Sequence, residues 1–253
     1  MQQTNRYFLS LSYKGSAYHG WQSQPNALAV QEVLEKALKV FFRFDVETLG
    51  CGRTDSGVHA TQFYAHIDLP SQIEINQEKF LKSLNSLLPS DIAVAELISV
   101  HNDAHARFDA TLRAYQYHIN FQKNPFKADS SWFIKDELDL PEMQKAAAII
   151  KDYEDFGAFC KSKADNFTNI CHIQKSEWEK TRDGLIYHVS ANRFLRNMVR
   201  AIVGTLVDVG KGKISAETMH QIIQSQNRSV AGASVPACGL FLTQVEYPYI
   251  ITL

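Results

Sequence analysis

The sequence predicts an α+β protein in which two halves repeat a βαββαβ order, with antiparallel sheets flanked by helices and a cleft between the halves. Three features support this fold class. Stretches that alternate apolar and polar residues are interleaved with stretches of helical periodicity, each half returns to the same order, and Asp183-Gly184 gives a strong hairpin turn in the second half. We expect an N-terminal half over residues 1–105 and a C-terminal half over 106–253.

In the first half, the stretch 6–14 alternates as a strand does, and the apolar residues of 30–41 recur at helical spacing. Two more strands are expected at 46–51 and 61–68, followed by a helix at 79–88 and a strand at 92–100. The resulting order is βαββαβ.

The second half begins with an expected strand at 112–121 and a helix at 141–150. A hairpin with arms at 172–180 and 185–191 follows, then a long helix at 194–209, a second helix at 215–225 and a last strand at 240–246. The order again approximates βαββαβ, with one additional helix.

The composition is that of a globular protein: 253 residues, 45% of them hydrophobic and 21% charged, with a net charge of −1. No stretch reaches the roughly 18 apolar residues of a membrane span, so we expect a cytoplasmic protein without a membrane partner. The net charge gives no overall signal for nucleic acid. Residues 190–230, however, hold six arginines and lysines against two acidic residues, which predicts a local basic patch.

The most distinctive local feature is the glycine-rich loop G-C-G-R-T-D-S-G-V-H-A over residues 50–60, which places Arg53 two residues before Asp55. Glycines let a loop turn tightly and approach a ligand. A T-D-S-G segment is also a common turn in which the aspartate bonds its own backbone. Asp55-Ser56-Gly57 further matches the core motif of aspartic proteases, but those enzymes need two copies and this chain has one.

Other motif searches exclude several classes of site. The chain has no phosphate-binding G-x-x-x-x-G-K-[ST], no G-x-S-x-G around Ser56 and no H-E-x-x-H. Cys51, Cys160, Cys171 and Cys238 form no C-x-x-C pair. We therefore expect neither a metal nor a nucleotide cofactor, and no small-molecule cofactor of another kind.

Two elements of the second half carry further candidates. In the helix expected from Phe194, Arg193, Arg196 and Arg200 fall within one 60° sector, a spacing that suits phosphates or a carboxylate, although such a row is more commonly a solvated face. In the strand 112–121, alternation places Tyr115 on the face of Arg113 and Ile119, largely enclosed. A strand tyrosine is usually part of the core, and beside a cleft it can stack on a base.

Taken together, five ordered motifs resemble the TruA family of tRNA pseudouridine synthases. The stretch 13–22, Y-K-G-S-A-Y-H-G-W-Q, is similar to the family's opening motif, and 52–60 resembles its G-R-T-D-A-G-V-H-A. The remaining resemblances are A-R-F at 106–108 with the Y-x-Y strand at 115–117, F-L-R-N-M-V-R at 194–200, and the closing stretch 231–242. Ser56, Cys51, Ala201 and Ser234 depart from the residues usual in the family, and Ser56 leaves open a different substrate range.

The resemblance implies two RRM-like halves and an isomerase that converts uridine to pseudouridine at positions 38, 39 and 40 of the tRNA anticodon stem-loop, as a homodimer. Asp55 would be the nucleophile, and whether it attacks the base or the sugar carbon first stays open. Arg53 would help displace the target base, and Arg200 would pair with Asp55 and favour its ionised form. Tyr115, Leu240 and Arg196 would contact the RNA substrate. A module that binds RNA without catalysis is the remaining alternative.

Overall fold

The computed structural model of the chain describes residues 3–161 and 167–250. These residues form two compact units. Unit 1 comprises the described residues up to Thr111 together with those from Leu242 onward, and unit 2 runs Leu112–Phe241. The C-terminal segment from Leu242 onward therefore belongs with the N-terminal part of the chain. The functional division into halves 1–105 and 106–253 stays a prediction.

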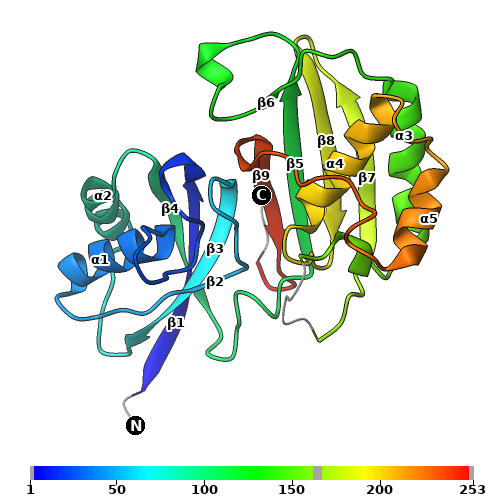
Figure 1. Ribbon diagram of the computed structural model, residues 1–253. Helices are drawn as coiled ribbons and strands as arrows, with labels where there is room; N and C mark the ends of the chain where they lie inside the picture. The colour runs from blue at the N-terminus through cyan, green and yellow to red at the C-terminus, as the bar shows by residue number, and fades with distance from the viewer. Residues whose placement is uncertain (1–2, 162–166, 251–253) are drawn as a thin grey trace. The chain divides into compact units, whose positions relative to one another are not determined.

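Unit 1 is built on an antiparallel sheet with the strand order β4-β1-β3, and the short β2 pairs with β3. The strands are β1 Thr4–Tyr13, β2 Leu49–Gly50, β3 His59–Pro70 and β4 Ile92–Val100. The helices are η1 Gly15–Ala17, α1 Val30–Phe42 and α2 Gln77–Leu87. Apart from the short η1, this is the predicted βαββαβ order, and Figure 1 shows α1 and α2 lying together on one side of the strands.

The apolar residues of helix α1 lie on its buried face. Val30, Leu34, Ala37 and Leu38 are all buried, and their spacing of three and four residues places them on one helical face. Asn76 caps α2 by accepting a hydrogen bond from the backbone N–H of Lys79, at 2.9 Å. The buried face of α1 and the start of α2 therefore follow from the local sequence.

The C-terminal segment completes the core of unit 1. The last strand, β9 Leu240–Glu246, begins in unit 2 and continues into unit 1. The Tyr247 hydroxyl donates to the carbonyl oxygen of Ala106 at 2.6 Å, and its ring meets Phe8 edge-on at 5.1 Å. Residues far apart in the chain thus share one aromatic core.

Unit 2 is also a layer of mostly antiparallel strands with helices. Its strand order is β5-β8-β7, and the short β6 pairs in parallel with β5. The strands are β5 Leu112–Asn120, β6 Trp132–Phe133, β7 Ile173–Lys180 and β8 Gly184–Ala191. The helices are η2 Pro125–Lys127, α3 Leu140–Ile149, η3 Ile150–Asp152, η4 Gly157–Phe159, α4 Met198–Gly210, α5 Thr218–Ser225 and η5 Ala237–Gly239. Helix α3 packs against α4, α5 and β7 (Figure 1).

The predicted α+β class is confirmed, and the main correction concerns α4. This helix begins at Met198, four residues later than expected. Asn197 adopts a left-handed backbone conformation, with φ 66° and ψ 3°, which a right-handed helix cannot include. Among the residues that the structure describes, no helix has both the length and the apolar character that a membrane crossing requires.

Candidate functional site

The loop that carries Asp55 lies between β2 and β3, and backbone hydrogen bonds hold it against the segment after β1. The backbone N–H of Trp21 donates to the Thr54 carbonyl at 3.4 Å, and that of Gly57 donates to the Tyr18 carbonyl at 3.2 Å. Within the loop, the Val58 N–H donates to the Asp55 carbonyl at 3.1 Å. The backbone on both sides of Asp55 is therefore fixed.

Hydrogen bonds of two side chains also hold this loop against the N-terminal segment. The hydroxyls of Tyr13 and Thr54 share a buried hydrogen bond of 2.9 Å. His59 accepts a hydrogen bond at Nδ1 from the backbone N–H of Gly15, at 3.1 Å, which fixes its neutral tautomer with the proton on Nε2. Tyr13 and Gly15 of the motif at 13–22 thus contact Thr54 and His59 of the motif at 52–60.

Trp21 anchors the same region through its ring. It stacks on Phe63 of β3, with ring centroids 4.2 Å apart, and it is 2% exposed. A side chain at Gly50 would overlap the rings of Trp21 and Phe63, so glycine is needed there for close packing. Sequence reasoning gave Trp21 no physical role, because its contact with Phe63 crosses more than forty residues of chain.

The polar side chains of this fixed loop differ in their exposure to solvent. Asp55 is half-buried, Arg53 and Ser56 are exposed, and Thr54 between them is buried. The Ser56 hydroxyl donates to the Tyr18 carbonyl at 3.3 Å. The loop therefore presents a carboxylate and a guanidinium from one rigid turn, and Ser56 adds one more contact to that turn.

Unit 2 holds the other predicted site residues. Tyr115 of β5 lies opposite Val189 of β8 and is half-buried, so it is less enclosed than expected. Its ring meets Phe194 edge-on, with centroids 5.1 Å apart. The neighbouring Tyr117 is fully buried, and its hydroxyl donates to the Pro236 carbonyl at 2.8 Å. Of these two tyrosines, Tyr115 is the one that a ligand can reach.

Arg200 lies in the first turn of α4 and is half-buried. Its Nε donates to the carbonyl oxygen of Val235 at 2.8 Å, and the Val235 N–H donates back to the Arg200 carbonyl at 3.3 Å. Arg228 supports the same segment by donating to the Gly232 carbonyl and to Ser234 Oγ, both at 3.0 Å. The guanidinium of Arg200 is therefore oriented by the stretch that precedes β9.

The predicted sector of three arginines on one helical face is wrong. Arg193 and Arg196 precede α4, and Asn197 in its left-handed conformation separates them from Arg200. Arg196 is exposed, and its carbonyl accepts a hydrogen bond from the Lys161 N–H at 3.1 Å. Leu240 is buried at the start of β9. Phe194, the expected first residue of the helix, lies before α4 and contacts Tyr115.

Potential metal ligands do not gather in the part of the chain that the structure describes. No group of three or more histidine, cysteine, aspartate or glutamate side chains is arranged there to hold a metal ion. All four cysteines are free thiols, and two of them, Cys51 and Cys171, are buried.

Comparison with known proteins identifies the family. The family model described as tRNA pseudouridine synthase matches residues 153–248. The tRNA pseudouridine synthase A of Bacteroides fragilis is 48% identical over 244 residues, which cover 96% of each chain. The protein of the same name from Thermoanaerobacter pseudethanolicus is 39% identical, over 94% of this chain and 97% of the relative. At this identity over nearly the whole length, the chain belongs to the tRNA pseudouridine synthase A family.

Proposed function

We infer that this chain is a tRNA pseudouridine synthase, an isomerase that converts uridine to pseudouridine in the anticodon stem-loop of tRNA. The observation that carries this inference is the similarity to synthases of this name over 96% of the chain, with both units included. The target uridines that we propose are those at positions 38, 39 and 40.

We propose that Asp55 is the nucleophile. Its carboxylate attacks the uridine, the N-glycosidic bond breaks, and the uracil turns before its C5 bonds to the sugar carbon. The bond to Asp55 then breaks, C5 gives up its proton to a base, and N1, which has left the sugar, gains a proton, so the product has the same atoms as the substrate. The hydrogen bonds on both sides of Asp55 support this role, because a fixed backbone holds the carboxylate in one reactive position.

The other residues act on the base and on the ionised carboxylate. We propose that exposed Arg53 helps displace the target uridine from its stack, which costs a few kcal/mol. Half-buried Tyr115 stacks on the uracil and takes the C5 proton, and Leu240 lines the pocket. Arg200 pairs with Asp55, while Arg196 contacts phosphate.

We further propose that the enzyme works in the cytoplasm as a homodimer on which each tRNA contacts both subunits. Folded RNA is recognised mostly by shape and backbone contacts, which suits a dimer that accepts many tRNA sequences. Light scattering of the purified protein tests the dimer: a mass of twice 28.6 kDa is expected, and a monomer at micromolar concentration would contradict it.

The decisive experiment compares Asp55→Asn with the wild type on an unmodified tRNA transcript. Carbodiimide mapping locates any pseudouridine, and filter binding measures tRNA affinity. The amide keeps the shape of the carboxylate but cannot attack, so we expect no product and an affinity within a few-fold of wild type. Asp45→Asn is the matched control, because Asp45 is an exposed surface carboxylate paired with Lys39 at 2.7 Å. Measurable turnover by Asp55→Asn would exclude the nucleophile role.

A further inference from the structure

The loop that follows β5 forms a small open pocket with a volume of about 170 Å³. Residues 120 and 122–127 line it from one side, and Asp183 from the turn between β7 and β8 lines it from the other. The pocket is smaller than the roughly 300–1,000 Å³ of sites for drug-sized ligands. It can accept a small fragment such as a single base or part of a nucleotide.

The backbone of this loop is held in place by hydrogen bonds. Asn124 caps the turn η2 by accepting from the Phe126 N–H at 2.9 Å. The buried Ser131 hydroxyl contacts both Asn120 Oδ1, at 2.8 Å, and the Lys127 carbonyl, at 2.9 Å. Asn120 in turn donates to the Gln122 carbonyl. The loop is therefore a fixed surface that needs little ordering on binding a ligand.

The loop presents an apolar ring to water. Phe126 at the centre of η2 is 93% exposed, although burial of a phenylalanine is favourable. The ring contributes nothing to the core of unit 2, and the hydrogen-bonded turn keeps it outside. An exposed aromatic ring carried on a fixed backbone is a typical stacking platform for an unpaired base.

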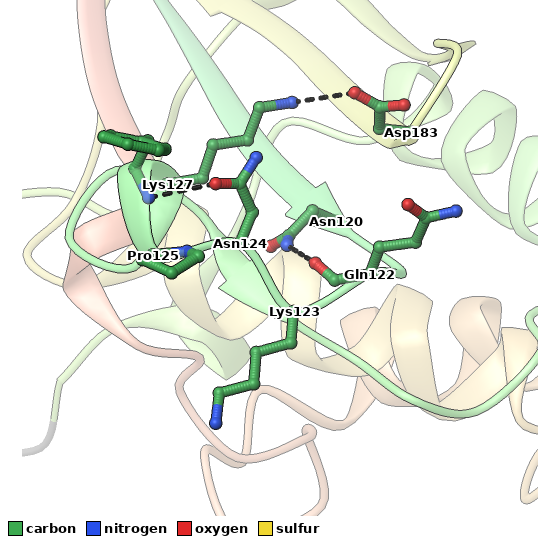
Figure 2. Close-up of a pocket in the computed structure, with 8 residues that line it drawn as sticks. Asn120, Gln122, Lys123, Asn124, Pro125, Lys127 and Asp183 are labelled. Carbon is green, nitrogen blue, oxygen red and sulfur yellow. Dashed lines mark hydrogen bonds and ion pairs between the residues drawn. The ribbon is translucent and has the colours of Figure 1, made fainter.

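Positively charged residues lie close to Phe126 in the chain. Lys123 and Lys127 flank Phe126, and Figure 2 shows Lys127 extended toward Asp183 while Lys123 points away from that pair. The Lys127–Asp183 pair has an N–O distance of 3.3 Å, and Arg182 Nε lies 4.0 Å from the same carboxylate. Together with Asp129 of the same loop, three cations stand with two carboxylates, a small positive excess that favours an anionic partner.

We propose that this pocket binds one nucleotide of the tRNA other than the uridine that is isomerised. The base stacks on Phe126, the amides of Gln122 and Asn124 face its polar edge, and Lys123 binds an adjacent phosphate. The proposal rests on the proposed function. Tyr115, assigned there to the target uracil, precedes Asn120 by five residues of strand, or about 17 Å, so a second nucleotide fills the pocket.

A second copy of this chain fits the pocket less well. The centres of homodimer interfaces are depleted in charged residues, lysine in particular, whereas two lysines flank this phenylalanine. RNA uses both features at once, because each nucleotide carries a flat base beside a phosphate. We therefore take RNA as the ligand of this surface, and self-association is one of the outcomes that the test can show.

The test uses Phe126→Leu and Phe126→Tyr in the full-length protein. Leucine keeps an apolar side chain and removes the flat ring, and tyrosine keeps the ring. We expect Phe126→Leu to weaken tRNA binding about 5- to 150-fold, the range for loss of one stacked base, and Phe126→Tyr to bind as wild type does. The single-turnover rate at saturating tRNA and the midpoint of thermal unfolding should stay unchanged in both.

Lys123→Ala provides the independent electrostatic measurement. We expect the slope of log affinity against log salt to fall in magnitude by about one. Lys145→Ala on α3, an equally exposed lysine paired with Glu142, should leave the slope unchanged.

Three results would overturn the pocket proposal. They are binding by Phe126→Leu within twofold of wild type, equal losses for the leucine and tyrosine variants, and a change of oligomeric state in Phe126→Leu, which would assign the surface to a second copy. Wild-type protein that binds tRNA but forms no pseudouridine would instead contradict the proposed function and leave the binding measurement intact.

Discussion

The backbone of Gly20 lies directly against the carbonyl oxygen of Thr54, the residue before Asp55. Gly20 has a φ of +94°, and a β-carbon there would overlap that oxygen. The N-terminal motif thus acts as a support for the loop that presents Asp55. Two stretches more than thirty residues apart in the chain form one local structure.

Gly20→Ala should therefore disturb the loop as well as the local backbone. A left-handed conformation at a residue other than glycine costs roughly 1–3 kcal/mol, and the overlap with Thr54 adds to this cost. We expect a lower midpoint of urea unfolding and a single-turnover rate that falls at least tenfold.

Gly212→Ala is the matched control. Gly212 also has a positive φ, of +67°, but a β-carbon there would meet no atom within 4 Å. This variant should lose stability and keep its single-turnover rate. If both glycine variants keep that rate, the support that Gly20 gives to the loop is irrelevant to activity.

Arg196 and Arg200 should affect different steps. Arg196→Ala removes an exposed cation, so tRNA binding should weaken and the magnitude of the salt slope should fall by about one. Arg200→Ala removes the proposed partner of Asp55. It should mainly lower the single-turnover rate and raise the pH at which half of the maximal rate is reached.

The loss of the Arg200 hydrogen bond to Val235 could by itself disturb the segment before β9. Arg228→Ala controls for this, because Arg228 bonds the same segment but has no proposed role in the chemistry. If Arg228→Ala changes the rate and its pH profile as Arg200→Ala does, Arg200 only supports the segment. If Arg200→Ala changes only the salt slope, its pairing with Asp55 is wrong.

The elements that the sequence predicted well are those with a strong local period. The strand at 92–100, the hairpin around Asp183-Gly184 and the buried face of α1 all follow from alternation, turn chemistry or helical spacing. The start of α4 does not, because leucine and arginine before Asn197 favour a helix as much as the residues after it. Only the left-handed backbone of Asn197 ends that pattern.

The candidate site was less accessible to sequence reasoning. Asp55 and Arg53 could be singled out through motif resemblance, but the contacts of Gly20, Trp21 and Phe63 that hold their loop are long-range and leave no local period. Phe194 beside Tyr115 was missed for the same reason. Exposed Phe126 has no signal at all in the sequence, since exposure is decided by the fold.

His66 should make unit 1 sensitive to acid. Burial, with Arg6 and His105 nearby, lowers the pKa of His66 to about 4, and its Nδ1 accepts a hydrogen bond from the Ala106 N–H at 3.1 Å. In the unfolded chain the pKa is about 6.5, so the unfolded state binds the proton first as the pH falls. Stability should therefore decrease by up to about 3 kcal/mol between pH 6.5 and pH 4.

His66→Gln removes this titration and keeps a hydrogen-bond acceptor. Urea unfolding at several pH values should show a flatter profile for His66→Gln than for wild type across that window. His19→Gln, at an exposed histidine, should follow the wild-type profile. Parallel profiles for all three proteins would show that His66 does not control the acid response.

The hydrogen-bonded hydroxyls of Tyr187 and Ser176 in the core of unit 2 predict different losses of stability for two substitutions that each remove one hydroxyl. The Tyr187 hydroxyl and Ser176 Oγ lie 2.7 Å apart, and Ser176 Oγ also donates to the Ala147 carbonyl at 2.7 Å. Since that bond uses the serine proton, Tyr187 is the donor to Ser176. Both side chains are buried, so no water replaces a lost partner.

Ser176→Ala should therefore cost more than Tyr187→Phe. The alanine leaves the buried tyrosine donor without its partner and removes one bond from Ala147, a loss of roughly 2–3 kcal/mol in the free energy of unfolding. The phenylalanine removes donor and hydroxyl together and leaves the serine bonded to Ala147, which costs about 1 kcal/mol. Urea unfolding followed by tryptophan fluorescence measures both, because the Trp178 ring lies 5.0 Å from the Tyr187 ring. Equal losses, or a larger loss for Tyr187→Phe, would mean that the serine does not link strand and helix in the way its hydrogen bonds indicate.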